Sequence, residues 1–252
     1  MQQSEGFIEK GNKKRVYWLN CAIYRLKQAA LAWWKELEAS MKRLGFTHLH
    51  SDAGVFHHKR LNIVVITYVD DCVFTGKDHK HILKLKQKFM EIWECRDLGE
   101  AKEFLKMRIC WVRNKLILDQ QDYLKKIVSQ FGLENAKSAS TPLPEWYEPE
   151  ANTGNCTPDF RQQYQSVIGS LLYIMLGTRP DISYAVIKMA QFASNPSSDH
   201  MNKAKQILQY LNSSKDLSLE FDGDSDKGLI AFTDSDWASD KIMHKSQTGY
   251  FF

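Results

Sequence analysis

The sequence lacks any pair of cysteines at the C-x-x-C spacing of a zinc knuckle. Its five cysteines are an odd number and are scattered along the chain as Cys21, Cys72, Cys95, Cys110 and Cys156. A disulfide framework is therefore not expected, and neither is a structural zinc site. This cysteine usage favours a reducing compartment inside the cell, either the cytoplasm or the nucleus.

Long apolar runs are also missing from the sequence. No stretch is long enough to span a bilayer. Residues 1–6 are polar and contain no apolar segment of the kind found in a signal peptide. Nothing in the sequence indicates secretion or a membrane partner.

The sequence also lacks a strong excess of charge of one sign, since its formal net charge is only +4. Such a balance is weak evidence for a nucleic-acid partner, and on charge alone a solvated surface with a few extra lysines is the favoured interpretation. With 43% hydrophobic and 25% charged residues, the composition is that of a soluble globular protein. A chain of 252 residues can bury a substantial core.

The hydrophobic pattern predicts a mixture of strands and helices. Strands are expected at residues 14–19, 55–58, 63–69 and 72–75, and a second hairpin at residues 104–111 and 116–118. Helices are expected at residues 33–44, 78–93, 123–131 and 160–176, from Arg179, and after Pro196 to about Leu211. Residues 217–221 and 229–233 have the pattern of the first strands of a further sheet.

The composition changes between residues 138 and 159, where four of the six prolines lie together with acidic and small polar residues. We interpret this segment as a linker between domains. The helix expected after Asp78 carries Lys80, Lys84, Lys86 and Lys88. A solvated face is the favoured interpretation of these lysines, and contact with phosphate is the alternative.

The tetrad Tyr68-Val69-Asp70-Asp71 ends an apolar, β-branched strand and precedes another strand. Its two carboxylates are therefore expected at the tip of a hairpin, where they repel each other unless a cation lies between them. Mg²⁺ prefers carboxylate oxygens together with phosphate, and phosphoryl-transfer enzymes hold two metal ions about 4 Å apart in this way. Taken alone, the tetrad is more simply a turn, because Asp is common in turns.

The tetrad is part of an ordered series of motifs that resembles the polymerase polyprotein of copia-type retrotransposons. Residues 24–33 resemble the family's Tyr-Gly-Leu-Lys-Gln-Ala-Pro-Arg-Ala-Trp block, and residues 68–71 match its metal-binding motif. The later matches, in chain order, are the primer grip at residues 98–107, the thumb at 120–142, the connecting region at 164–185, and the opening of ribonuclease H at 233–238 and 245–250.

The resemblance implies an α+β fold in five parts. They are a partial reverse-transcriptase palm at residues 1–98, a primer grip and thumb-like segment at 99–137, the linker at 138–159, a helical connection region at 160–224, and the first strands of a ribonuclease H-like domain at 225–252. It also implies descent from an RNA-directed DNA polymerase, with Mg²⁺ or Mn²⁺ as cofactor. The implied partners are an RNA–DNA or DNA template-primer and, if the chain is active, a deoxynucleoside triphosphate.

The resemblance assigns roles to individual residues. Asp70 and Asp71 correspond to catalytic metal ligands of the polymerase, and Asp234 to the first metal-binding carboxylate of ribonuclease H. A surface Asp at a strand end is the alternative for Asp234. The implied contacts with nucleic acid or nucleotide are Lys27, Gln28, Tyr68, Phe104, Leu105, Lys106 and Met107.

The chain also departs from the family's pattern. Arg25 and Lys106 stand where the family has glycine, and Ala30 and Leu31 replace a proline and an arginine. A glycine usually indicates a close backbone approach or an unusual φ, so Arg25 could obstruct the nucleotide.

The family's first catalytic aspartate motif would precede residues 6–7, and the remaining ribonuclease H carboxylates would follow residue 252. We therefore expect this chain to be inactive alone. The alternatives are a non-catalytic nucleic-acid-binding remnant, a domesticated module, or a chain without selected function.

Overall fold

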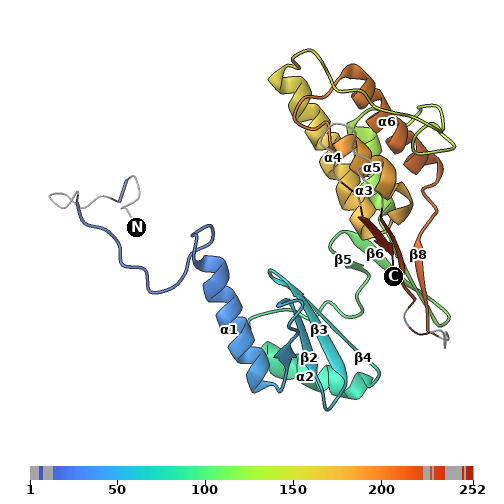
Figure 1. The fold of residues 1–252 in the computed structure, drawn as a ribbon. Helices are drawn as coiled ribbons and strands as arrows, with labels where there is room; N and C mark the ends of the chain where they lie inside the picture. The colour runs from blue at the N-terminus through green and yellow to red at the C-terminus, as the bar shows by residue number, and fades with distance from the viewer. Residues whose placement is uncertain are drawn as a thin grey trace. The chain divides into compact units, whose positions relative to one another are not determined.

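The computed structural model describes residues 6–7, 14–223, 228, 230–235, 246 and 248–251. The chain divides into two compact units, Met1–Glu100 and Ala101–Phe252, and mixes helices with sheets, as the predicted α+β class requires (Figure 1). Among the helices of the described residues, none combines the length and the apolar character needed to cross a bilayer.

The first unit is a four-stranded antiparallel sheet with two helices packed on one face. The strands, in spatial order, are β1 (Thr47–His48), β2 (Val55–His58), β3 (Ile63–Tyr68) and β4 (Asp71–Gly76). Phe56, Val65 and Phe74 lie opposite one another in the ladder, and they pack with side chains of α1 (Ala29–Arg43) and α2 (His79–Ile92) in one core.

Local chemistry explains where the two helices of this unit end and begin. Gly45 follows α1 with a φ of +88°, and a Cβ at this position would lie 2.8 Å from Nε2 of His58, so a side chain here would strain the backbone and displace the His58 ring. Asp78 caps α2, as predicted, because its carboxylate accepts hydrogen bonds from the backbone N–H groups of Lys80 and His81.

The second unit combines a four-stranded antiparallel sheet with a group of helices. The strands, in spatial order, are β5 (Glu103–Phe104), β6 (Met107–Val112), β7 (Lys115–Asp119) and β8 (Leu219–Asp222). The helices are α3 (Gln121–Gln130), α4 (Pro158–Gly177), the 3₁₀ turn η1 (Pro180–Ile182), α5 (Ser183–Ala190) and α6 (Ser198–Ser213). Two further strands, β9 (Phe232–Ser235) and β10 (Thr248–Phe251), pair with each other.

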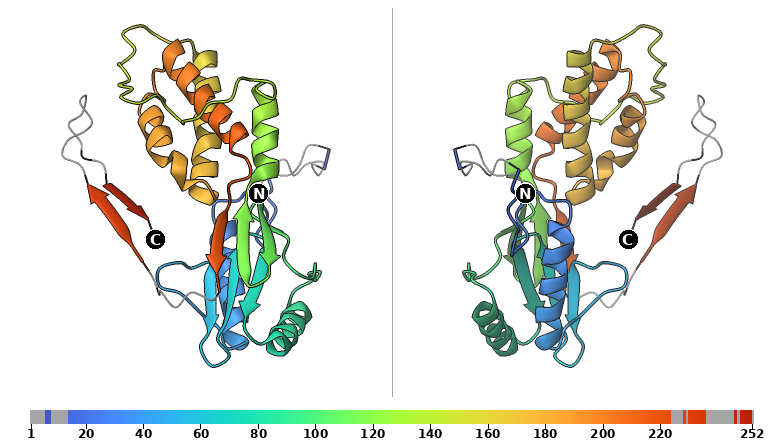
Figure 2. Two further views of the ribbon diagram at one scale, coloured as in Figure 1. Left: turned by 90° about the vertical axis from the view of Figure 1, so that its right-hand side faces the viewer. Right: turned by 90° about the vertical axis from the view of Figure 1, so that its left-hand side faces the viewer.

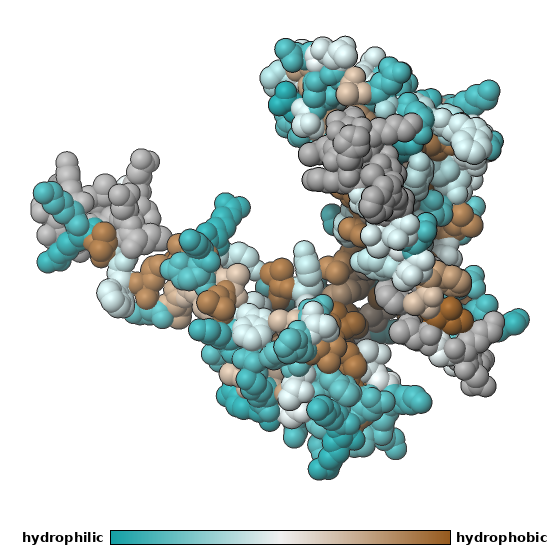
Figure 3. All heavy atoms as spheres, in the orientation of Figure 1, coloured by the Kyte–Doolittle hydropathy of each residue, from teal (hydrophilic) through white to brown (hydrophobic). Residues whose placement is uncertain are grey.

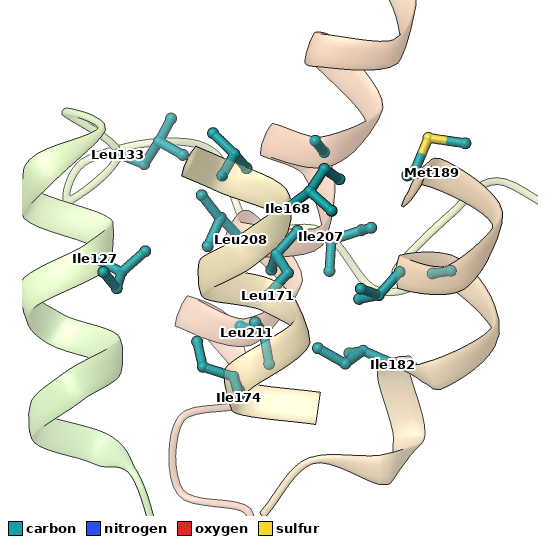
Figure 4. Packing of buried hydrophobic residues seen from close by; sticks show 14 of the residues in the cluster. Ile127, Leu133, Ile168, Leu171, Ile174, Ile182, Met189, Ile207, Leu208 and Leu211 are labelled. Carbon is teal, nitrogen blue, oxygen red and sulfur yellow. The ribbon is translucent and has the colours of Figure 1, made fainter. Parts of the chain in front are cut away.

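The helices of the second unit enclose its core. Leu171, Ile182 and Leu208 come from three different segments and are completely buried together (Figure 4). The predicted apolar face of α6 is confirmed, since Ala204, Ile207, Leu208 and Leu211 are all buried. Burial on this scale supplies the main stabilisation of a helical unit.

The segment predicted as a linker, residues 138–159, lies within the second unit and is attached to its helices. Nζ of Lys188 donates to the carbonyl oxygen of Tyr147 at 2.9 Å, and the Tyr147 hydroxyl donates to Asp199 at 2.6 Å. Asn152 donates to the carbonyl of Pro196 at 2.9 Å. The chain divides instead at Glu100, beside the predicted boundary between residues 98 and 99.

Three predicted strands differ from the structure. Residues 14–19 form no strand beyond an isolated bridge at Val16, and Trp18 in this segment is 91% exposed, so the segment is not packed into a core. Residues 104–111 are two strands, β5 and β6, joined by a tight turn. Residues 217–221 do not open a new sheet, because β8 pairs with β7 (Figure 2). Leu229 lies outside the described residues.

We predict that Leu208→Ala destabilises the second unit by about 2–5 kcal/mol, because it removes a completely buried side chain and leaves a cavity. Urea unfolding followed by circular dichroism measures the change. The matched control is Leu176→Ala, since Leu176 lies on α4 with 79% of its surface exposed and its truncation should shift stability by less than about 0.5 kcal/mol. Equal losses in both variants would contradict the assigned core.

Candidate functional site

The two predicted catalytic carboxylates lie at the tip of the β3–β4 hairpin. Tyr68 pairs with Asp71, so only Val69 and Asp70 reverse the chain. Val69 has a φ of +53°, a conformation that a β-branched residue rarely adopts and that two-residue turns normally give to Gly, Asn or Asp. Strain of this kind is concentrated at functional sites. Both carboxylates are exposed to solvent.

Two aromatic side chains of the Lys-Gln block hold this tip. The indole Nε1 of Trp33 donates to the carbonyl oxygen of Val69 at 3.2 Å, and the Trp33 ring packs edge-on against Trp93 with centroids 4.8 Å apart. The hydroxyl of Tyr24 donates to Oδ2 of Asp70 at 2.7 Å. These contacts join residues 24–33 to the Asp70–Asp71 hairpin. The sequence alone did not predict that Tyr24 and Trp33 contact the hairpin.

Lys27 and Gln28 lie in the same block and are exposed. Gln28 occupies the position before α1, where its carbonyl oxygen accepts from the N–H of Ala32 at 3.0 Å. Arg25, where the family has glycine, has a φ of +70°. Of the two usual reasons for a glycine, the structure shows the unusual φ at this position.

The carboxylates change the titration of their neighbours. Because the Tyr24 hydroxyl donates to Asp70, the pKa of Tyr24 is raised above its ordinary value. Burial raises the pKa of the Cys72 thiol to about 11, helped by the nearby Cys95 and by the charges of Asp71 and Asp70. The raised pKa disfavours the thiolate form of Cys72 at neutral pH.

Asp70 and Asp71 have the donor type that Mg²⁺ prefers, namely carboxylate oxygen. Within the described part of the chain, however, no group of three or more His, Cys, Asp or Glu residues could hold a metal ion. The described residues therefore match a two-metal site in the kind of ligand but not in its number.

The predicted primer-grip residues lie in the second unit. Leu105 and Lys106 form the turn between β5 and β6 with φ values of +51° and +56°, while Phe104 and Met107 face each other in the ladder. The hydroxyl of Tyr173, on α4, donates to the carbonyl oxygen of Leu105. The positive φ of Lys106 again agrees with a family glycine.

Asp234 lies on β9 opposite Gly249 and is exposed. The predicted motif residues 236–238, 245 and 247 lie outside the described residues. The assignment of Asp234 to a ribonuclease H site stays a prediction.

Comparison with known proteins decides the family. The family described as reverse transcriptase (RNA-dependent DNA polymerase) matches residues 1–145, which include the whole β3–β4 hairpin and its aromatic contacts. The chain belongs to the reverse transcriptase family. Members of this family use a divalent metal ion and bind a nucleic-acid template-primer.

The chain is also similar to Pol polyproteins of copia-type plant retrotransposons. It is 37% identical over 269 residues to the retrovirus-related Pol polyprotein from transposon TNT 1-94 of Nicotiana tabacum, an alignment that covers 100% of this chain and 20% of the relative. It is 33% identical over 255 residues to that of transposon RE2 of Arabidopsis thaliana, covering 99% and 17%.

The chain thus spans about a fifth of the length of these two polyproteins. No solved structure matches it significantly.

We predict that Asp70→Asn lowers the pKa of Tyr24 towards its ordinary value. The carboxylate stabilises the protonated phenol, so this stabilisation is present below the ordinary pKa and is lost as the pH rises through the raised pKa. NMR titration of the Tyr24 ring carbon measures the shift. Asp71→Asn is the control and should leave the Tyr24 pKa nearly unchanged; an unaltered titration in Asp70→Asn would refute the contact.

We predict that Lys106→Gly stabilises the second unit by roughly 0.5–1 kcal/mol, because relief of a left-handed conformation exceeds the added chain entropy. Thermal unfolding measures it. Lys102→Gly is the matched control, at an exposed position outside the set of positive-φ residues, and should lower stability instead. A drop in melting temperature for Lys106→Gly would show that its side chain, not its backbone, holds the turn.

Proposed function

We propose that this chain is the template-primer-binding part of a retrotransposon RNA-directed DNA polymerase, with Asp70 and Asp71 as its metal-binding carboxylates. The cofactor is Mg²⁺ or Mn²⁺, the partner is an RNA–DNA or DNA template-primer, and the substrate is a deoxynucleoside triphosphate. The observation that carries the proposal is the Asp70–Asp71 pair at a strained hairpin tip, joined to the Lys27–Gln28 block through Tyr24 and Trp33.

The roles of the remaining residues follow from their positions. Lys27 and Gln28 are exposed beside the aromatic contacts that hold the hairpin, and there they would face the template and the incoming nucleotide. Tyr68, 56% exposed at the end of β3, would lie near the primer terminus. The β5–β6 turn, Phe104 to Met107, would position the primer strand, and Asp234 would serve a ribonuclease H site.

Catalysis by this chain alone depends on how many carboxylates hold the metal ions. A two-metal phosphoryl transfer needs enough carboxylate ligands to hold both ions, and the described residues bring two to the hairpin tip. We therefore propose that the isolated chain binds a template-primer but extends it poorly. The second candidate, a non-catalytic nucleic-acid-binding module, rests on the same shortage of ligands.

Primer extension on an RNA template with Mg²⁺ or Mn²⁺ tests both candidates. For the isolated chain we expect incorporation close to that of Asp70→Asn. Robust synthesis that Asp70→Asn abolishes would overturn the proposed inactivity and support the polymerase assignment directly.

Binding of Mn²⁺, followed by its paramagnetic relaxation of solvent water, tests the metal site independently of turnover. We expect Asp70→Asn and Asp71→Asn each to weaken binding at least fivefold, since each removes one of two oxygen-donor side chains. Asp216→Asn, which alters an exposed carboxylate of the second unit, is the control. Equal binding in all three variants would refute the assigned ligands.

A further inference from the structure

The end of the β1–β4 sheet opposite the catalytic hairpin gathers positive charge. Ile63 pairs with Gly76, so the β2–β3 turn lies beside the connection from β4 to α2. A Cβ on Gly76 would lie only 3.2 Å from the carbonyl oxygen of Asn62, which shows how closely the two segments approach. Lys59 and Arg60 in the turn and Lys77 after β4 therefore occupy the same end of the sheet.

Helix α2 continues this charge. Lys80 and Lys84 lie on the first two turns of α2, after Lys77, and both are exposed. They are about 6 Å apart along the helix axis. We call Lys59, Arg60, Lys77, Lys80 and Lys84 the basic end. The surface of the first unit is largely hydrophilic in the view of Figure 3.

The members of the basic end form no ion pair with any residue that the structure describes, whereas Lys86 on the same helix contacts Asp97 at 2.5 Å. The carboxylate of Asp78, next to Lys77 in the chain, is already engaged by the N–H groups of Lys80 and His81 and by the His81 ring at 2.6 Å. The five cations are therefore available to a partner.

The positive charges at the start of α2 destabilise the helix. Its first turn contains no acidic residue and carries Lys80, although the N-terminus of a helix favours negative charge. Lys80 and Lys84 are also like charges at i and i+4, which repel. An external polyanion bound at this end would reverse both effects.

We propose that the basic end is a second RNA-binding site that holds the phosphate backbone. It lies about 20 Å from the catalytic hairpin, the length of the six-residue strand β3. No Phe, Tyr or Trp occurs in residues 57–62 or 76–88, so the expected contacts are mainly with phosphate and the binding is independent of sequence. The choice of RNA as the polyanion rests on the proposed function; the charge cluster itself does not.

The test compares two variants of the full chain with the same change in charge. One carries Lys59→Gln, Arg60→Gln, Lys80→Gln and Lys84→Gln; the control carries Lys35→Gln, Lys126→Gln, Lys137→Gln and Lys215→Gln, all exposed positions elsewhere. Binding of a fluorescent 20-nucleotide RNA is followed by anisotropy at several salt concentrations, and circular dichroism verifies that both variants fold.

We expect the basic-end variant to weaken RNA binding at least tenfold and to reduce the slope of log affinity against log salt by up to about 3, at about 0.7 per lost phosphate contact. The control should weaken it less than threefold. Equal losses in the two variants, or no loss in the first, would overturn the proposal.

A second measurement uses the wild-type chain and does not depend on any variant folding. Lysine acetylation with and without the same RNA, read by mass spectrometry, should show protection of Lys59, Lys77, Lys80 and Lys84. Unchanged acetylation at these four lysines in the presence of bound RNA would refute the site. Failure of the proposed function would appear differently, as Mn²⁺ binding that is insensitive to Asp70→Asn and Asp71→Asn.

Discussion

The pairing of β3 with β4 is the constraint on which the first unit depends. Ile63 and Val65 are completely buried beneath the helices, and a slip of one residue would turn both to the opposite face of the sheet. Burial therefore fixes the register, and the register leaves Val69 and Asp70 alone to reverse the chain. The exposed position of the two carboxylates and the positive φ of Val69 are both consequences of a core formed several residues away.

Elements with a strong local signal could be predicted from the sequence. The β-branched strand and the acidic pair gave the hairpin almost to the residue, and Asp78 marked the start of α2 because a cap acts on its own helix. Taken alone, the acidic pair favoured a simple turn, and the family resemblance assigned Asp70 and Asp71 to the site. Their grouping with Lys27 and Gln28 came from the family resemblance, and the structure supplied the physical link through Tyr24 and Trp33.

Features decided by distant residues could not be predicted in this way. Residues 217–221 have a strand pattern, but only the tertiary structure pairs them with β7, about a hundred residues earlier in the chain. Residues 14–19 alternate like a strand, yet in the described structure they form only an isolated bridge at Val16. The turn at Leu105 and Lys106 was hidden because neither residue is typical of a turn with positive φ.

Arg25 and Lys106, which stand where the family has glycine, show how a turn with positive φ can keep its backbone conformation without glycine. A left-handed conformation costs a residue with a side chain roughly 1–2 kcal/mol, so Arg25 and Lys106 would by themselves favour other backbone conformations. In each case a tyrosine hydroxyl makes a long-range hydrogen bond at the preceding residue: Tyr24 donates to Asp70, and Tyr173 donates to the carbonyl of Leu105. At both turns the backbone conformation that glycine permits is therefore kept by a residue with a side chain, next to a position anchored by a tertiary contact.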